Sequence, residues 1–253
     1  MTTATSTSVV DHDSDTASPA HLVGRLVVSG LALAAVLCAI GWVIVRLLTP
    51  SALTRWEDSV NQSWFLARTT FLNDASHIGS SLSETTSCIA VLIVVMLGFR
   101  WWLGRWRESL AVFAAIVGEL VVFLIVTAVV NRERPGVPRL DAAPPTSSFP
   151  SGHTAAAVAL YGCIAVVIAR NLRPRWFAAV VAGVCVVIPI VVGLSRIYRG
   201  MHHPTDVLFG ALGGGAWLLI VVRTLLPRDR PALDPPEDQD GDDVSPSRQV
   251  ASP

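Results

Sequence analysis

The chain has 253 residues, of which 52% are hydrophobic and only 15% charged, and its mean hydropathy is +0.54. A typical soluble domain carries about 25% charged residues, so this composition argues against a soluble protein and favours one embedded in a membrane. The formal net charge is zero, and all 19 basic residues are arginines. No basic excess therefore predicts a nucleic-acid partner.

The N-terminal region combines a polar tail with a first apolar span. Residues 1–22 are rich in serine, threonine and aspartate, which is typical of a disordered tail. Residues 26–45 carry no charge and are flanked by Arg25 and Arg46. A stretch of this length can cross a hydrocarbon layer of about 30 Å. The acidic character of the tail does not fit a cleaved signal peptide.

The segment 49–82 is more polar and carries regularly spaced aromatic residues, among them Trp56, Trp64 and Phe71. The spacing suits an amphipathic helix, and tryptophan is favoured at the membrane–water interface. We therefore predict an interfacial helix on the extracytoplasmic side. A helix that lies outside the membrane and packs on the rest of the protein fits the pattern equally well.

Five more apolar spans follow, and none alternates in hydropathy as a barrel strand would. We therefore predict an all-α, polytopic membrane protein, with six transmembrane helices in one domain over residues 23–227. Residues 228–253 are acidic and rich in proline and serine, which predicts a disordered tail. The five spans are approximately residues 83–103, 109–130, 154–170, 176–195 and 205–226.

Arginines indicate the orientation of this bundle. They gather near residues 100–107, 170–175 and 223–230, which lie on one side of a six-span protein. Positively charged short loops tend to remain in the cytoplasm. Both termini are therefore predicted to be cytoplasmic, and the loops 131–153 and 195–206 to face outward.

These two outward loops hold three polar clusters. Guanidinium groups suit an anion with several oxygens. The second cluster leads into a helix, whose first N–H groups would point at the same anion. We therefore predict an anion site where the apolar spans end. The clusters are NRERPG (131–136), FPSGHT (149–154) and SRIYRGMHHPTD (195–206).

Two histidines within these clusters suggest a reaction. His202 and Asp206 are four residues apart, so the carboxylate could reach back and fix the tautomer of the imidazole. A histidine held in this way can act as a nucleophile or a base. His153 could supply the acid. Together with the arginines, this predicts phosphoryl transfer through a phosphohistidine.

The three clusters resemble the signature motifs of the type 2 phosphatidic acid phosphatase (PAP2) superfamily. RP at 134–135, PSGH at 150–153 and SR-x5-H-x3-D at 195–206 occur in the family's order, and the resemblance covers about residues 55–226. It implies a six-helix core with an outward-facing site. It also implies a membrane phosphatase, without metal or other cofactor, that acts on a lipid phosphate or a polyprenyl pyrophosphate such as undecaprenyl pyrophosphate.

The resemblance also implies a role for each motif residue. His202 would be the nucleophile, Asp206 its orienting partner, and His153 the acid that protonates the leaving group. The phosphoryl oxygens would be held by Arg134, Arg196, Ser151 and the amide of Gly152.

One position departs from the family pattern. The first motif should begin with a lysine seven residues before Arg134, but Thr127 occupies that place. Arg132 could substitute for the lysine as a phosphate ligand. Without a substitute, the chain could be a weakly active or inactive protein that only binds lipid phosphates.

Two further groups have open roles at this stage. Glu119 falls in the middle of a span, where an ionisable side chain is a functional candidate; a structural hydrogen-bond partner is the interpretation we favour. Arg199 could join the anion site or be a solvated loop charge.

Overall fold

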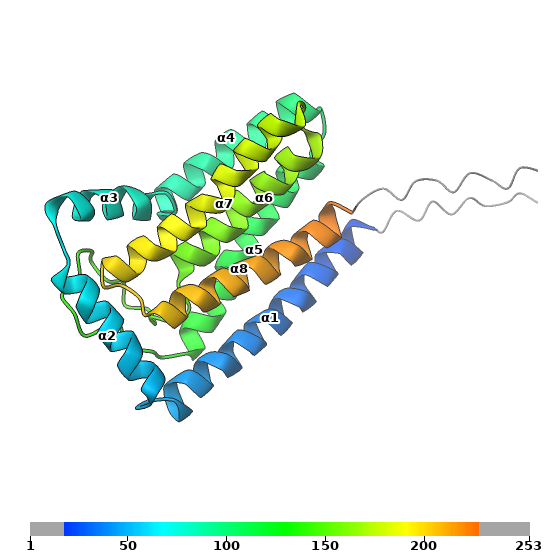
Figure 1. Ribbon diagram of the computed structural model, residues 1–253. Coiled ribbons are helices and arrows are strands. Elements are labelled where there is room, and N and C mark those ends of the chain that lie inside the picture. The colour runs from blue at the N-terminus through cyan, green and yellow to red at the C-terminus, as the bar shows by residue number, and fades with distance from the viewer. Residues whose placement is uncertain (1–17, 228–253) are drawn as a thin grey trace, which may run out of the picture.

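The computed structural model describes residues 18–227, which form eight α-helices (Figure 1). Six of these helices, α1 and α4 to α8, are long and apolar enough to cross a membrane. The predicted all-α fold with six spans is confirmed, and the chain is a multi-pass membrane protein. The helices are α1 (Pro19–Leu47), α2 (Ala52–Leu66), α3 (Thr70–Ser81), α4 (Thr85–Leu103), α5 (Arg107–Val129), α6 (Gly152–Asn171), α7 (Arg175–Tyr198) and α8 (Pro204–Leu225).

The first helix begins earlier than predicted. Ser18 caps α1, because its hydroxyl accepts a hydrogen bond of 3.4 Å from the amide of His21, and Pro19 suits the first helical turn. The last residues of the predicted N-terminal tail are therefore helical. Residues 1–17 and 228–253, which make up most of the two predicted tails, lie outside the described residues.

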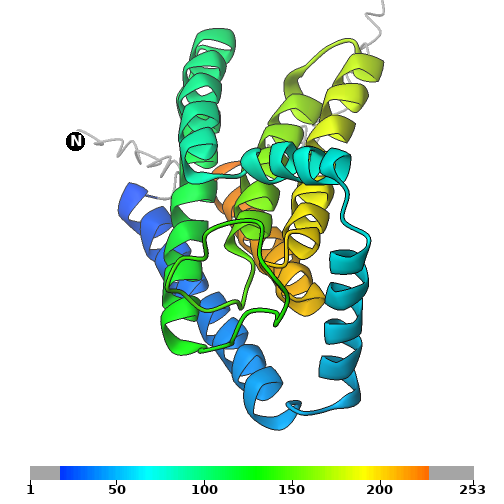
Figure 2. The same cartoon turned by 90° about the vertical axis from the view of Figure 1, so that its left-hand side faces the viewer.

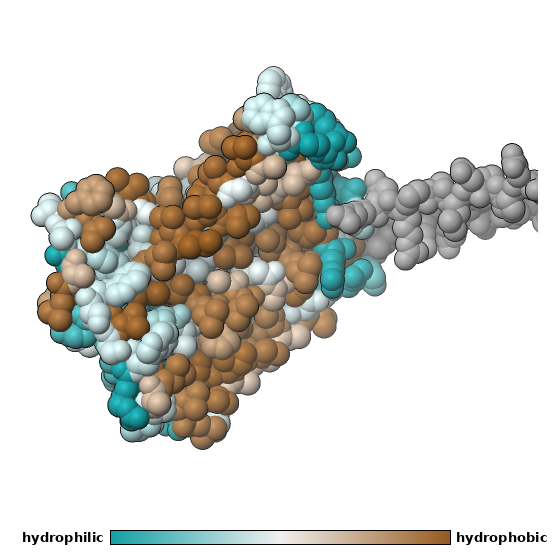
Figure 3. Space-filling view, in the orientation of Figure 1, coloured by the Kyte–Doolittle hydropathy of each residue, from teal (hydrophilic) through white to brown (hydrophobic). Residues whose placement is uncertain are grey.

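The face of the bundle seen in Figure 3 is apolar over its middle, with hydrophilic patches toward both ends. Large apolar side chains of α1, α4, α5 and α7 are exposed. In water such a surface would be costly, but against lipid it is the expected outer face of a membrane bundle. Trp101, Trp106 and Trp176 are exposed near one end, where tryptophan is favoured at the membrane interface.

Helix α6 is the centre of the bundle and packs against α5, α7 and α8. Two glycines allow α8 to approach it closely. A Cβ atom at Gly210 would lie 2.5 Å from the carbonyl oxygen of Ser151, and one at Gly214 would lie 2.6 Å from that of Ala155. The amide of Ser151 also donates a hydrogen bond of 2.9 Å to the carbonyl of Asp206. This contact brings the second and third polar clusters together.

The predicted interfacial helix is two helices, α2 and α3, which frame one end of the bundle (Figures 1 and 2). Helix α2 packs against α7 and α8, and α3 packs against α7. Apolar side chains are exposed on both helices, among them Trp56 at 52% and Phe71 at 77%, whereas Glu57 and Asn61 are buried. The segment therefore combines both sequence interpretations, because some of its polar side chains enter the bundle while exposed aromatic ones suit the membrane interface.

Candidate active site

The three polar clusters meet at the end of the bundle that α2 and α3 frame. The connection between α5 and α6, which carries the first cluster, lies across this end (Figure 2). A cavity of about 710 Å³ opens there, and five of the eight predicted site residues line it. These five are Arg134, Gly152, His153, Arg196 and His202.

His202 is buried at the floor of this cavity, in the connection between α7 and α8. Its Nδ1 lies 2.8 Å from the carbonyl oxygen of Ser148. A carbonyl can only accept, so Nδ1 carries the proton and Nε2 keeps a free lone pair. Burial, together with the charges of Arg196 and Arg134, lowers the pKa of His202 well below its ordinary value. The imidazole is therefore neutral near pH 7.

The prediction that Asp206 hydrogen-bonds to His202 is wrong. Its Oδ2 lies 3.9 Å from His202 Nδ1, beyond hydrogen-bond distance. The carboxylate instead accepts hydrogen bonds from the Arg132 guanidinium, from the Ser148 hydroxyl and, at 2.8 Å, from the amide of His203. Asp206 thus holds the two segments that flank the imidazole, and the carbonyl of Ser148 orients the imidazole directly.

The two motif arginines present free donors. Arg134 donates from Nη1 to the carbonyl of Met201 at 2.8 Å, and Arg196 donates from Nη1 to Ser80 Oγ at 2.8 Å. The Nε atom of each is buried and has no hydrogen-bond partner within the described chain. An unpaired buried donor is costly, so both groups are suited to an anion that enters the cavity. Within residues 18–227, no group of three acidic, histidine or cysteine side chains could hold a metal ion.

Comparisons with known proteins agree with this geometry. Residues 109–230 match the model of the PAP2 superfamily. The chain carries a PAP2 superfamily domain. Its fold is similar to the crystal structure of a transmembrane PAP2-type phosphatidylglycerolphosphate phosphatase from Bacillus subtilis. The TM-score is 0.65 at 23% identity, over 79% of this chain and 93% of the other.

Several curated relatives are similar to this PAP2 chain. Phosphatidylglycerophosphatase B of Bacillus subtilis is 24% identical over 189 residues, which cover 72% of this chain and 88% of the relative. A probable diacylglycerol pyrophosphate phosphatase 1 of Schizosaccharomyces pombe is 38% identical over 87 residues, or 32% of this chain and 30% of the relative. The bacitracin transport permease protein BcrC of Bacillus licheniformis is 27% identical over 166 residues, or 61% and 77%.

Two predicted phosphate ligands of this PAP2 chain do not line the cavity. The Ser151 side chain is fully buried and its hydroxyl lies 2.9 Å from Thr154 Oγ1, facing the α6–α8 contact. Arg132 donates to Glu57 at 2.6 Å, to Thr205 at 2.8 Å and to Asp206. Because these carboxylates engage the guanidinium, Arg132 is not on the wall of this cavity, although it lines a neighbouring hollow together with Thr127.

Thr127, which stands in the lysine position, lies near the end of α5. It shares a second, shallower hollow with Arg134 and the loop 131–147. Its hydroxyl is buried and has no hydrogen-bond partner among residues 18–227. The first motif of this PAP2 chain therefore supplies one cation beside the cavity, where the family pattern supplies two.

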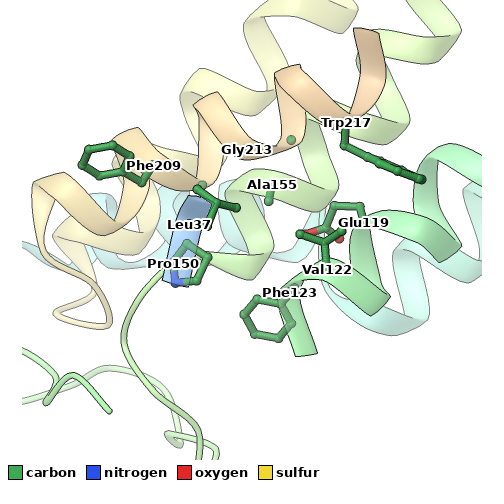
Figure 4. Close-up of a pocket in the computed structure, with 11 residues that line it drawn as sticks. Leu37, Glu119, Val122, Phe123, Pro150, Ala155, Phe209, Gly213 and Trp217 are labelled. Carbon is green, nitrogen blue, oxygen red and sulfur yellow. The ribbon is translucent and has the colours of Figure 1, made fainter. Parts of the chain in front are cut away.

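Glu119 does not make the structural hydrogen bond that we favoured. It is 5% exposed and has no hydrogen bond or ion pair within the described residues. Its carboxyl group points into a small void among Val122, Ala155 and Trp217 (Figure 4), and it also lines the wall of the main cavity.

Three residues of the site were missed from the sequence. Ser148 stands only three positions before Ser151, but a backbone carbonyl leaves no signal in a side-chain motif. Glu57 lies in the segment predicted to be interfacial, where its charge fitted a solvated face. Asp141, which lines the cavity, follows the first motif in a loop without recognisable spacing.

Proposed function

We propose that this protein is a membrane lipid phosphatase that works through a phosphohistidine on His202. The observation that carries the proposal is a single cavity with two kinds of wall. Its polar end holds His153, His202 and the two motif arginines, and its other wall is apolar. A phosphate headgroup and the start of an acyl chain would fit these two ends. The apolar wall includes Leu92, Ile116, Leu120 and Phe123 of α4 and α5.

The first chemical step is attack on phosphorus. The Nε2 lone pair of His202 forms a bond to phosphorus while the bond from phosphorus to the lipid oxygen breaks. The charge of the bound phosphate favours the protonated form of His153, which gives its proton to the leaving oxygen, so the alcohol departs neutral. Arg134, Arg196 and the N–H groups at the start of α6 stabilise the charge that develops on the phosphoryl oxygens.

The second step regenerates the enzyme. His153, now neutral, takes a proton from a water molecule, whose oxygen attacks the phosphohistidine. The bond between phosphorus and Nε2 breaks and inorganic phosphate leaves. The hydrogen bond from Nδ1 to Ser148 persists through both steps and keeps Nε2 directed at the cavity.

The proposed substrates are glycerol-based lipids with a terminal phosphate. Two relatives are named for phosphatidylglycerophosphate and diacylglycerol pyrophosphate, and each of these lipids combines a terminal phosphate with a diacylglycerol body. Undecaprenyl pyrophosphate has the same division into a charged head and an apolar tail. A panel of these three lipids separates the classes.

The orientation is also part of the proposal. The described chain begins and ends at the same end of the bundle, opposite α2 and α3 (Figure 1). The arginine-rich loops near residues 100–107 and 170–175 support a cytoplasmic position for that end. The cavity would then face outward. Labelling of single cysteines at exposed positions of α2 in intact cells tests this placement.

The decisive test is phosphate release by protein purified in detergent. We expect turnover of at least one lipid in the panel with EDTA present. His202→Ala should abolish both this turnover and the labelled phosphoenzyme that wild type yields after alkaline quenching, which is chosen because phosphohistidine is acid-labile. His21→Ala, at an exposed histidine of the opposite end, is the matched control and should retain full activity. Undiminished turnover by His202→Ala would refute the assignment.

A further inference from the structure

Asp141 forms a bridge between two arginines at the end of α7. Its Oδ2 accepts hydrogen bonds from Arg196 Nη1 at 2.9 Å and Arg199 Nε at 2.8 Å, and its Oδ1 accepts one from Arg199 Nη2 at 2.5 Å. None of the three sequence motifs includes Asp141. It lies in the connection between α5 and α6, on the wall of the same cavity as His153 and His202.

Arg199 is fully committed to anchoring this bridge. It is 5% exposed, and each of its five N–H groups has a partner. Beyond the two bonds to Asp141, Nη2 donates to the carbonyl of Leu140 at 3.3 Å, and Nη1 donates to the carbonyl of Asn73 and to Ser76 Oγ, both at 3.1 Å. Arg199 therefore has no donor for a phosphate, and its charge fixes the carboxylate of Asp141 in place.

Arg196 is held differently, by one nitrogen only. Both N–H groups of Nη1 are used, by Ser80 Oγ at 2.8 Å and by Asp141. Nε is buried without a partner, and Nη2 makes no hydrogen bond to the described residues. Nε and Nη2 form the edge of a guanidinium that binds two oxygens in parallel. Asp141 and Ser80 thus leave the bidentate edge free for the anion.

The Asp141 side chain is ionised near neutral pH. Partial burial acts to raise its pKa, but the hydrogen bond and charge of Arg199, with the charge of Arg196, outweigh burial and hold the pKa below its ordinary value. The group is therefore a carboxylate near neutral pH. It also separates two arginine charges, which would repel each other in this partly buried place.

We propose that Asp141 is a positioning residue that aims the free edge of Arg196 at the phosphoryl group. The proposal rests on the proposed phosphatase function. Removing the carboxylate would release Nη1 and let Arg199 repel Arg196, so the guanidinium would lose its orientation. Small misplacements of such a group cost much of its effect, up to about a hundredfold per ångström.

Inhibition by inorganic phosphate, the product, tests the proposal on the full chain. We expect Asp141→Asn to raise the inhibition constant of phosphate about tenfold and to lower kcat/KM for the lipid by at least as much. Ser80→Ala, which removes the other bond to Nη1, should act in the same direction by a smaller factor. Asp58→Asn is the matched control, because Asp58 is an exposed acid on α2, at the same end of the bundle but outside the three polar clusters, and should change neither constant.

A double-mutant cycle separates positioning from general structural damage. If Asp141 acts through Arg196, then Asp141→Asn should change the phosphate constant less than about twofold in an Arg196→Ala background. An equal loss in both backgrounds would overturn the proposal, and so would tighter phosphate binding by Asp141→Asn, since that would make Asp141 a competitor of phosphate. Wild-type protein without turnover on any lipid would instead refute the proposed function itself.

Discussion

A substitution at Glu57 tests whether helix α2, which lies outside the six spans, stabilises the site. Its carboxylate is fully buried, accepts from Arg132 Nη2 at 2.6 Å, and accepts from the amide and the hydroxyl of Thr205 at 3.0 and 2.5 Å. Glu57→Gln keeps the shape but removes the charge and turns an amide N–H₂ toward one of these donors. The change removes one of the two buried carboxylates that pair with Arg132 and breaks part of the hydrogen-bond network that Glu57 makes with Thr205.

The expected loss of stability follows from the burial of this ion pair. Removing one partner of a buried pair costs about 3–5 kcal/mol. For a chain of this size, each kcal/mol lowers the melting temperature by about 2–4 °C. We therefore expect Glu57→Gln to melt at least about 6 °C below wild type in a fluorescence-monitored thermal scan in detergent.

The neighbouring acid supplies the control. Asp58 is exposed on the same helix, so Asp58→Asn should change the free energy of unfolding by no more than about 0.5 kcal/mol. Glu57→Gln should also lose lipid phosphatase activity, because Thr205 and Arg132 fix the start of α8 and Asp206. A Glu57→Gln protein that melts within a degree of wild type would show that α2 does not brace the site.

Three other predictions follow from single groups. The pKa of His202 is depressed by burial, so the folded protein binds fewer protons than the unfolded chain below about pH 6.5. Stability should therefore fall as pH drops from about 7 to about 5, and the decline in melting temperature should be shallower in His202→Gln. Glu119→Met removes a buried carboxyl without a partner among the described residues, and should raise the melting temperature by about 2–6 °C; a lower value would reveal an unseen partner. Thr127→Lys should lower the inhibition constant of phosphate about fivefold, since one added charge near a partly exposed anion contributes about 1 kcal/mol; no change would mean that the lysine cannot reach the cavity.

The six spans could be predicted because charged residues interrupt the apolar sequence at each end of a helix. The clusters could be placed on one side for the same reason, since two spans separate the two loops that carry them. Hydropathy did not reveal that the segment 49–82 is two helices. Its break near residues 67–69 contains no proline or glycine to mark it.

The contacts within the site were harder to predict from the sequence, because they join residues far apart in the chain. Thr205 and Glu57 are 148 positions apart, and Arg132 and Asp206 are 74 positions apart. The spacing of His202 and Asp206 pointed to a direct contact only if both lay on one helix. Helix α8 begins at Pro204, so His202 lies outside it and the i,i+4 rule does not apply.

The charge balance of the cavity gives a physical meaning to Thr127. Arg132 and Arg199 belong by sequence to the arginine-rich clusters, but each is bound to a carboxylate, Arg132 to Glu57 and Asp206, and Arg199 to Asp141. Of the four arginines in the clusters 131–136 and 195–206, only Arg134 and Arg196 keep free donors toward the cavity.

Two arginines match the charge of a phosphate monoester, which is about −1.5 to −2 at neutral pH. A lysine at position 127 would add a third cation. Inorganic phosphate carries a charge similar to that of the lipid phosphate, so the lysine would stabilise the bound product as much as the bound substrate. Uniform stabilisation of substrate and product does not speed a reaction, whereas it slows release of the product. We therefore expect a cage with two cations to favour departure of phosphate over its retention.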